Sequence, residues 1–142
     1  MSKRKQHGKD LPPWLTSGAS SETFFVCTDS LLKSPAFQDL SNKQKVLYVT
    51  CLSQMYGKRK PCRDYPDVKE FQRPEVFYFN KAIAVSYGLY SDKDTSLYKD
   101  MNVLISHGFI EKLLDGKVTY KKNVYCFSAK WKTWGKNKNG VG

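Results

Sequence analysis

The side chains with the clearest chemical role lie between residues 93 and 122, a stretch that contains several lysines and small polar residues. Lysine binds phosphate oxygens, and small hydroxyl or amide side chains can reach the edges of bases. Eight residues are therefore predicted to bind double-stranded DNA: Lys93, Thr95, Ser96, Lys99, Asn102, Lys117, Lys121 and Lys122. The first five fall in one segment and the last three in another, so two elements must bring them together.

The cysteines and histidines are not spaced as a metal or catalytic site. Cysteines stand at 27, 51, 62 and 126 without a Cys-x-x-Cys pair, and neither His7 nor His107 is close to one in sequence. Structural zinc sites normally use closely spaced ligand pairs. The sequence also lacks a Gly-rich phosphate loop and a nucleophile–base motif. We therefore expect no enzyme activity, catalytic residue, metal, cofactor or small-molecule substrate.

The charge of the chain favours a polyanionic partner. With 24 Lys and Arg against 13 Asp and Glu, the net charge is +11, and the two ends supply most of the excess. Lysines near phosphates gain affinity by releasing counterions. Basic ends also simply keep a protein in solution, and charge alone does not separate nucleic acid from an anionic membrane surface. No apolar run approaches the ~18 residues that cross a bilayer, so we expect a cytoplasmic protein with no membrane partner.

Apolar spacing and turn residues predict the elements that position these side chains. The predicted strands cover 23–28, 76–79, 109–114 and 124–127. Short helical turns are predicted within 29–40. Three longer helices are predicted: one from a capping box at Ser41 and Gln44 to Gly57, one from Asn80 to Tyr87 and one over 91–107. These predictions rest on N-cap residues, on apolar periodicity and on glycine stops. Residues 58–75 are predicted to be a long polar loop.

The order of the last elements is typical of a winged helix-turn-helix. The chain would form a helix, a three-residue turn at 88–90, a second helix from Ser91 and a lysine-rich hairpin with its tip near 115–123. In this motif the second helix enters a DNA major groove about 12 Å wide, and the hairpin, called the wing, contacts the DNA backbone. The polar face of that helix holds Thr95, Lys99, Asn102 and Ser106, with Ser96 at its flank. Asp100 adjoins Lys99 and would repel a phosphate. We predict an α+β winged helix-turn-helix domain over 23–131, with a three-helix core, a β-hairpin wing and flexible basic tails at 1–22 and 132–142.

Several motifs carry a resemblance to a known family. They are Thr28-Asp29-Ser30-Leu31-Leu32, Ser34-Pro35-Ala36-Phe37-Gln38-Asp39-Leu40-Ser41, Lys45-Val46-Leu47-Tyr48, Leu104-Ile105-Ser106-His107-Gly108-Phe109-Ile110-Glu111 and Asn123-Val124-Tyr125. Over about residues 24–131 the chain resembles small winged helix-turn-helix DNA-binding proteins of bacterial plasmids and integrative elements. It is also similar to the N-terminal domain of plasmid replication initiators. The resemblance implies transcription regulation or the initiation of replication or transfer, at the nucleoid or on a plasmid.

Alternatives remain open at this level. Winged helices also serve as protein–protein interaction modules without direct DNA binding, and the acidic residues within 91–107 fit that role. A homodimer would read two half-sites, with Phe24-Phe25 or the C-terminal segment as its contact. Trp131 and Trp134 could stack on unpaired bases, although such tryptophans more often pack a terminal segment on the core.

Overall fold

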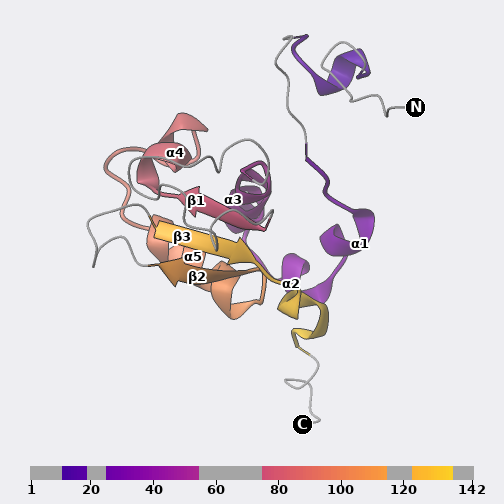
Figure 1. Cartoon of the computed structure of the whole chain (residues 1–142), viewed down its shortest axis with the longest axis vertical. Helices are drawn as coiled ribbons and strands as arrows, with labels where there is room; N and C mark the ends of the chain where they lie inside the picture. Colours follow the sequence, from indigo (N-terminus) through magenta and orange to yellow (C-terminus); the bar gives the residue numbers. More distant parts are fainter. Residues whose placement is uncertain (1–10, 19–24, 55–74, 115–122, 136–142) are drawn as a thin grey trace.

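The computed structural model describes residues 11–18, 25–54, 75–114 and 123–135. Within these residues the fold is α+β, as predicted, with five α-helices and one three-stranded antiparallel sheet (Figure 1). The elements are α1 (Asp29–Leu32), α2 (Pro35–Gln38), α3 (Asn42–Leu52), β1 (Val76–Phe79), α4 (Lys81–Ser86), α5 (Leu97–Ser106), β2 (Ile110–Leu114) and β3 (Asn123–Phe127), with short 3-10 helices η2 (Pro13–Leu15) and η4 (Lys130–Thr133).

Local capping residues start three of the helices, α2, α3 and α4, where the sequence predicts them. Ser34 accepts a hydrogen bond from the Phe37 N–H at 3.2 Å, and Asn80 accepts one from the Ile83 N–H at 3.0 Å. Ser41 and Gln44 form the predicted capping box, in which each side chain accepts the other residue's backbone N–H. Because these bonds satisfy N–H groups that have no partner inside the helix, the starts of α2, α3 and α4 are confirmed.

Two predicted elements differ from the structure. Residues 25–28 form neither helix nor strand and lead into α1, where the Thr28 hydroxyl accepts the Leu31 N–H. Phe25 and Cys27 pack on the core, which accounts for their strand-like alternation, but the described strands pair only with one another. The predicted helix to Gly57 ends instead at Leu52, and Gly57 lies outside the described residues. The Ser53 hydroxyl donates to the Thr50 carbonyl, a local bond that competes with helix continuation.

The sheet has the strand order β1-β3-β2, so β3 is central. Phe77 pairs with Tyr125 on one side of β3, and Ile110 pairs with Phe127 on the other. All three strands were predicted to within one residue, and the pairing of β2 with β3 confirms the two strands of the predicted hairpin. Residues 115–122, which connect them, lie outside the described residues.

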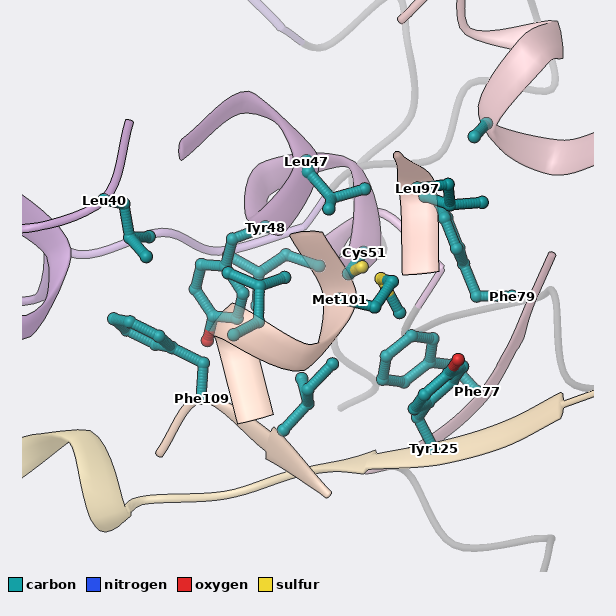
Figure 2. Close-up of a cluster of buried hydrophobic side chains, with 14 of the residues drawn as sticks. Leu40, Leu47, Tyr48, Cys51, Phe77, Phe79, Leu97, Met101, Phe109 and Tyr125 are labelled. Atoms are coloured by element: carbon teal, nitrogen blue, oxygen red, sulfur yellow. The ribbon is translucent and has the colours of Figure 1, made fainter. Parts of the chain in front are cut away.

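The hydrophobic core lies between the helices and one face of this sheet. Figure 2 shows side chains from α3 and α5 facing Phe77 and Tyr125 of the sheet. Apolar spacing predicts Leu97, Met101, Leu104 and Ile105 as the buried face of the α5 segment. The first three are each no more than 1% exposed, and Ile105 is half-buried. Burial of this stripe determines which side of α5 is left on the surface. No helix in the described part of the chain has the length and apolar character to cross a bilayer.

The C-terminal segment packs against the end of α5. The Trp131 N–H donates to the Gly108 carbonyl at 3.0 Å, and the Trp131 ring stacks on Phe109. The Trp134 ring stacks on His107 with 4.5 Å between the ring centroids. Packing of the two tryptophans on the core is therefore what the structure shows, and the packed chain continues past residue 131, where the tail was predicted to begin.

Candidate nucleic-acid interface

The structure gathers the first five predicted binding residues around the start of α5. Lys99 and Asn102 lie on the exposed face of the helix, and Thr95 and Lys93 are exposed just before it. Ser96 occupies the N-cap position and is half-buried, and its side chain makes no capping hydrogen bond. The other three candidates, Lys117, Lys121 and Lys122, lie outside the described residues. The part of the predicted site that the structure describes is therefore the surface of α5.

Helix α5 begins six residues later than predicted. It starts at Leu97 rather than Ser91, and ten residues rather than three separate it from α4. Residues 91–94 close a separate turn, in which the Asp94 N–H donates to the Ser91 carbonyl at 3.1 Å and the Asp94 carboxylate accepts the Ser91 N–H at 3.3 Å. The prediction of a three-residue turn followed by a helix from Ser91 is wrong.

A lysine from α4 binds the turn that precedes α5. The Lys81 ammonium donates to the backbone carbonyl oxygens of Asp92 and Asp94. In a helix running from Ser91, those carbonyls would instead accept N–H groups four residues further along. By binding them from α4, Lys81 stabilises the turn over residues 91–94.

The carboxylate of Asp100 is bound within the protein. It accepts the Tyr90 hydroxyl at 2.6 Å and the Gln44 amide at 3.0 Å. Tyr90 is 4% exposed, and its burial, together with this hydrogen bond, raises the pKa of its hydroxyl above the ordinary value. Two neutral donors thus hold the Asp100 carboxylate against Tyr90 and Gln44, and the carboxylate keeps its negative charge.

Asp94 is held in a similar way by Lys43 of α3. The Lys43 ammonium lies 3.8 Å from the Asp94 carboxylate and 4.3 Å from the centre of the Tyr90 ring. These contacts, with those of Asp100, fasten the connection between α4 and α5 to α3. Asp92 is exposed, and its side chain is not bound in this network.

Three outward side chains of α5 have no hydrogen-bond or ion-pair partner among the residues that the structure describes. In the described part of the chain, Tyr98, Lys99 and Asn102 make no side-chain hydrogen bond or ion pair. The Ser106 hydroxyl differs, because it donates to the Val103 carbonyl at 2.9 Å. Tyr98, 40% exposed, was missed as a candidate. Its position beside Lys99 and four residues before Asn102 was the available signal, since residues at i and i+4 share a helix face.

The described residues carry little of the net charge. They contain nine Lys and no Arg against seven Asp and Glu, a net of +2 of the total +11. The remaining excess lies in the segments outside the described residues. The attraction to a polyanion predicted from the whole sequence therefore comes mainly from those segments, whereas the described part contributes the shape and polar surface of α5.

No three His, Cys, Asp or Glu side chains of the described residues come together as a group that could hold a metal ion. His107 and Asp39 approach to 2.8 Å, but as a pair that joins α2 to the end of α5. The His107 imidazole also contacts the Val103 carbonyl at 2.9 Å. These contacts serve to anchor the end of α5.

Comparison with family models, curated proteins and solved structures gives no match to this chain. The resemblance over residues 24–131 therefore stays a prediction. A function has to be argued from the arrangement of the chain's own residues around α5.

Proposed function

We propose that this chain is a winged helix-turn-helix protein that binds double-stranded DNA. It would serve a bacterial mobile element, in transcription regulation or in the initiation of replication or transfer, at the nucleoid or on a plasmid in the cytoplasm. The order of α3, β1, α4, α5, β2 and β3, with paired strands flanking the position of a lysine-rich loop, supports this fold. In this proposal the ten-residue connection between α4 and α5 is the turn of the motif.

One observation carries the proposal. The exposed face of α5 presents Tyr98, Lys99 and Asn102, which have no partner among the described residues, while the adjacent Asp100 carboxylate is held by Tyr90 and Gln44. A helix surface of this composition offers hydrogen-bond donors to an anion. A helix 10–12 Å across also matches a major groove about 12 Å wide.

Each part of the interface has its own role. Lys99 neutralises a phosphate beside the groove, and Thr95 and Ser96 at the start of α5 reach the backbone or a base edge. Lys93 and the loop lysines Lys117, Lys121 and Lys122 bind the flanking backbone in a sequence-independent way. The protein acts by binding alone, without a cofactor and without catalysis.

Duplex binding measured by fluorescence anisotropy over a range of salt concentrations tests the proposal. The logarithm of the affinity should fall linearly with the logarithm of salt, with a slope of about −0.9 for each phosphate neutralised. Lys99→Glu should weaken binding roughly tenfold or more at ~100 mM salt. Lys33→Glu is the matched control, because Lys33 is an exposed lysine that follows the last residue of α1 and pairs with Asp29. Absence of binding to any duplex at ~50 mM salt, or equal effects of the two variants, would contradict the proposal.

The near-neutral charge of the described residues favours one alternative, a protein–protein interaction module. In that case the exposed Tyr98 would contact a partner protein. Lys99→Glu combined with Lys121→Glu separates the two functions. Under the alternative, the doubly substituted chain still captures its partner, and the unsubstituted chain binds no duplex.

A further inference from the structure

We infer that Asn102 reads the adenine of an A·T base pair in the major groove and that Tyr98 contacts a nearby thymine methyl group. The inference rests on the proposed function and adds to it the base class that the site recognises. It is carried by the position of the two side chains on α5, by their lack of partners among the described residues and by the chemistry of an amide beside an aromatic ring.

Asn102 has an exposed amide at the centre of the outward face of α5. Its neighbours in sequence, Met101 and Val103, are buried or half-buried, so the helix directs residue 102 away from the core. In the described part of the chain its amide bonds to no other group. Asparagine is a weaker helix former than alanine, because its side chain competes for backbone hydrogen bonds. The residue thus offers α5 neither packing nor capping, which favours a role in contacting a ligand.

The amide group matches adenine better than the other outward side chains do. A carboxamide can accept from the adenine N6 amino group while donating to N7, a pairing that a lysine ammonium or a hydroxyl cannot make. Lys99 is a point charge suited to phosphate. The Ser106 hydroxyl is already bound to the Val103 carbonyl. Asn102 is therefore the residue of this face that distinguishes one base pair from another.

Tyr98 supplies an apolar surface one helical turn before Asn102. Residues four apart in a helix share a face and are separated by about 6 Å along its axis, close to two base-pair steps of about 3.4 Å. The Tyr98 ring is 40% exposed and engaged in no ring stacking or hydrogen bond within the described residues. A thymine methyl within two base pairs of the adenine is the apolar group that the major groove offers to such a ring.

Selection from a random duplex pool, followed by atom-level changes in the selected site, tests the inference. The wild-type chain should select a site with a defined adenine, and Asn102→Ala should lose that preference while still binding. Replacing that adenine by 7-deazaadenine removes the N7 acceptor and should weaken wild-type binding roughly 5- to 150-fold, with no further effect on Asn102→Ala. Replacing the nearby thymine by uracil should weaken the wild type several-fold but leave Tyr98→Ala unaffected.

Gln38→Ala is the matched control, because it removes an exposed amide from α2 rather than α5. It should retain the adenine preference and the full 7-deazaadenine effect. If the wild type binds DNA but Asn102→Ala selects the same adenine and keeps the same 7-deazaadenine effect, the inference is wrong and the proposed function stands. If the wild type binds no duplex at all, the proposed function itself fails. Circular dichroism should show all three variants folded, since Asn102, Tyr98 and Gln38 are exposed residues.

Discussion

Gln44 and Asp100 are 56 residues apart in the chain, and a hydrogen bond of 3.0 Å joins the Gln44 amide nitrogen to the Asp100 carboxylate. The same Gln44 side chain accepts the Ser41 N–H through its amide oxygen at 3.0 Å. One residue thus caps α3 and holds α5, so the orientation of the proposed DNA-binding helix depends on a residue outside it.

Gln44→Glu separates these two roles of Gln44. A carboxylate still accepts the Ser41 N–H, but it cannot donate to Asp100 and repels it instead. We expect the free energy of unfolding to fall by about 1–3 kcal/mol at pH 7, as measured by urea denaturation. The loss should shrink towards pH 4, because the introduced carboxyl has an ordinary pKa of about 4.3 and becomes protonated there. Unchanged stability at pH 7 would show that the contact with Asp100 contributes nothing.

The buried tyrosines make the protein sensitive to alkali. Burial raises the pKa of both Tyr48 and Tyr90 above the ordinary value, and for Tyr90 the bond to Asp100 adds to the increase. A raised pKa favours the protonated form in the folded state, so this stability is complete below about pH 10 and is lost at higher pH as the hydroxyls ionise. Absorbance titration should show tyrosines that ionise only together with unfolding.

Tyr90→Phe provides the matched variant for the alkaline titration. It should cost about 1.5–3 kcal/mol at neutral pH, because Asp100 loses a hydrogen bond from a buried donor. One fewer tyrosine should then ionise with unfolding. A smooth titration of all nine tyrosines near pH 10 would contradict the assignment.

Gly108→Ala should destabilise the junction of α5, β2 and η4. Gly108 has φ +87°, and a Cβ added there would lie 2.6 Å from the Trp131 backbone nitrogen. The neighbour is backbone that already donates to the Gly108 carbonyl, so it has little freedom to move. We expect the free energy of unfolding, measured by thermal or urea denaturation, to fall by about 1–3 kcal/mol because of the backbone conformation alone. The clash with Trp131 should lower it further. Gly88→Ala is the control, since Gly88 also has a positive φ but no atom within 4 Å of its added Cβ; equal losses would mean that the clash has no effect.

Asp92→Asn should strengthen DNA binding. Asp92 is an exposed acid in the turn that precedes α5, and unlike Asp94 and Asp100 its side chain is not held by the network around Tyr90. Removing one negative charge near a phosphate gains up to about 1 kcal/mol in water, or about a fivefold rise in affinity. The gain should fade at high salt because of screening. Anisotropy titrations that show weaker binding would place Asp92 in contact with a base or a donor of the DNA.

Cys51 should resist thiol reagents in the folded protein. It is fully buried in α3, and burial raises the pKa of its thiol, so the reactive thiolate is scarce. Alkylation with iodoacetamide at pH 8, followed by mass spectrometry, should modify Cys51 at least about 100-fold more slowly in the folded than in the unfolded protein. Labelling of Cys51 as fast as of the half-buried Cys27 would contradict the core that Figure 2 shows.

Much of the secondary structure could be predicted because its causes are local. The Ser34, Ser41 and Asn80 caps each bind an N–H three residues ahead, so a few neighbouring residues determine where α2, α3 and α4 begin. The apolar spacing of Leu97, Met101 and Leu104 likewise determined which side of α5 is buried. The strands over 76–79, 109–114 and 124–127 followed from short apolar runs between turn residues. In each case the interaction spans a few residues, which a sequence pattern records.

The tertiary structure decided where α5 begins and which charges are free around it. Lys81 binds the carbonyls of Asp92 and Asp94 from α4, and Gln44 with Tyr90 binds Asp100. None of these pairs follows from helical or strand periodicity, because each depends on how α3, α4 and α5 pack in space. The sequence alone therefore determined the types of side chain on the proposed interface. Packing determined which of them are engaged internally and which remain available to a ligand.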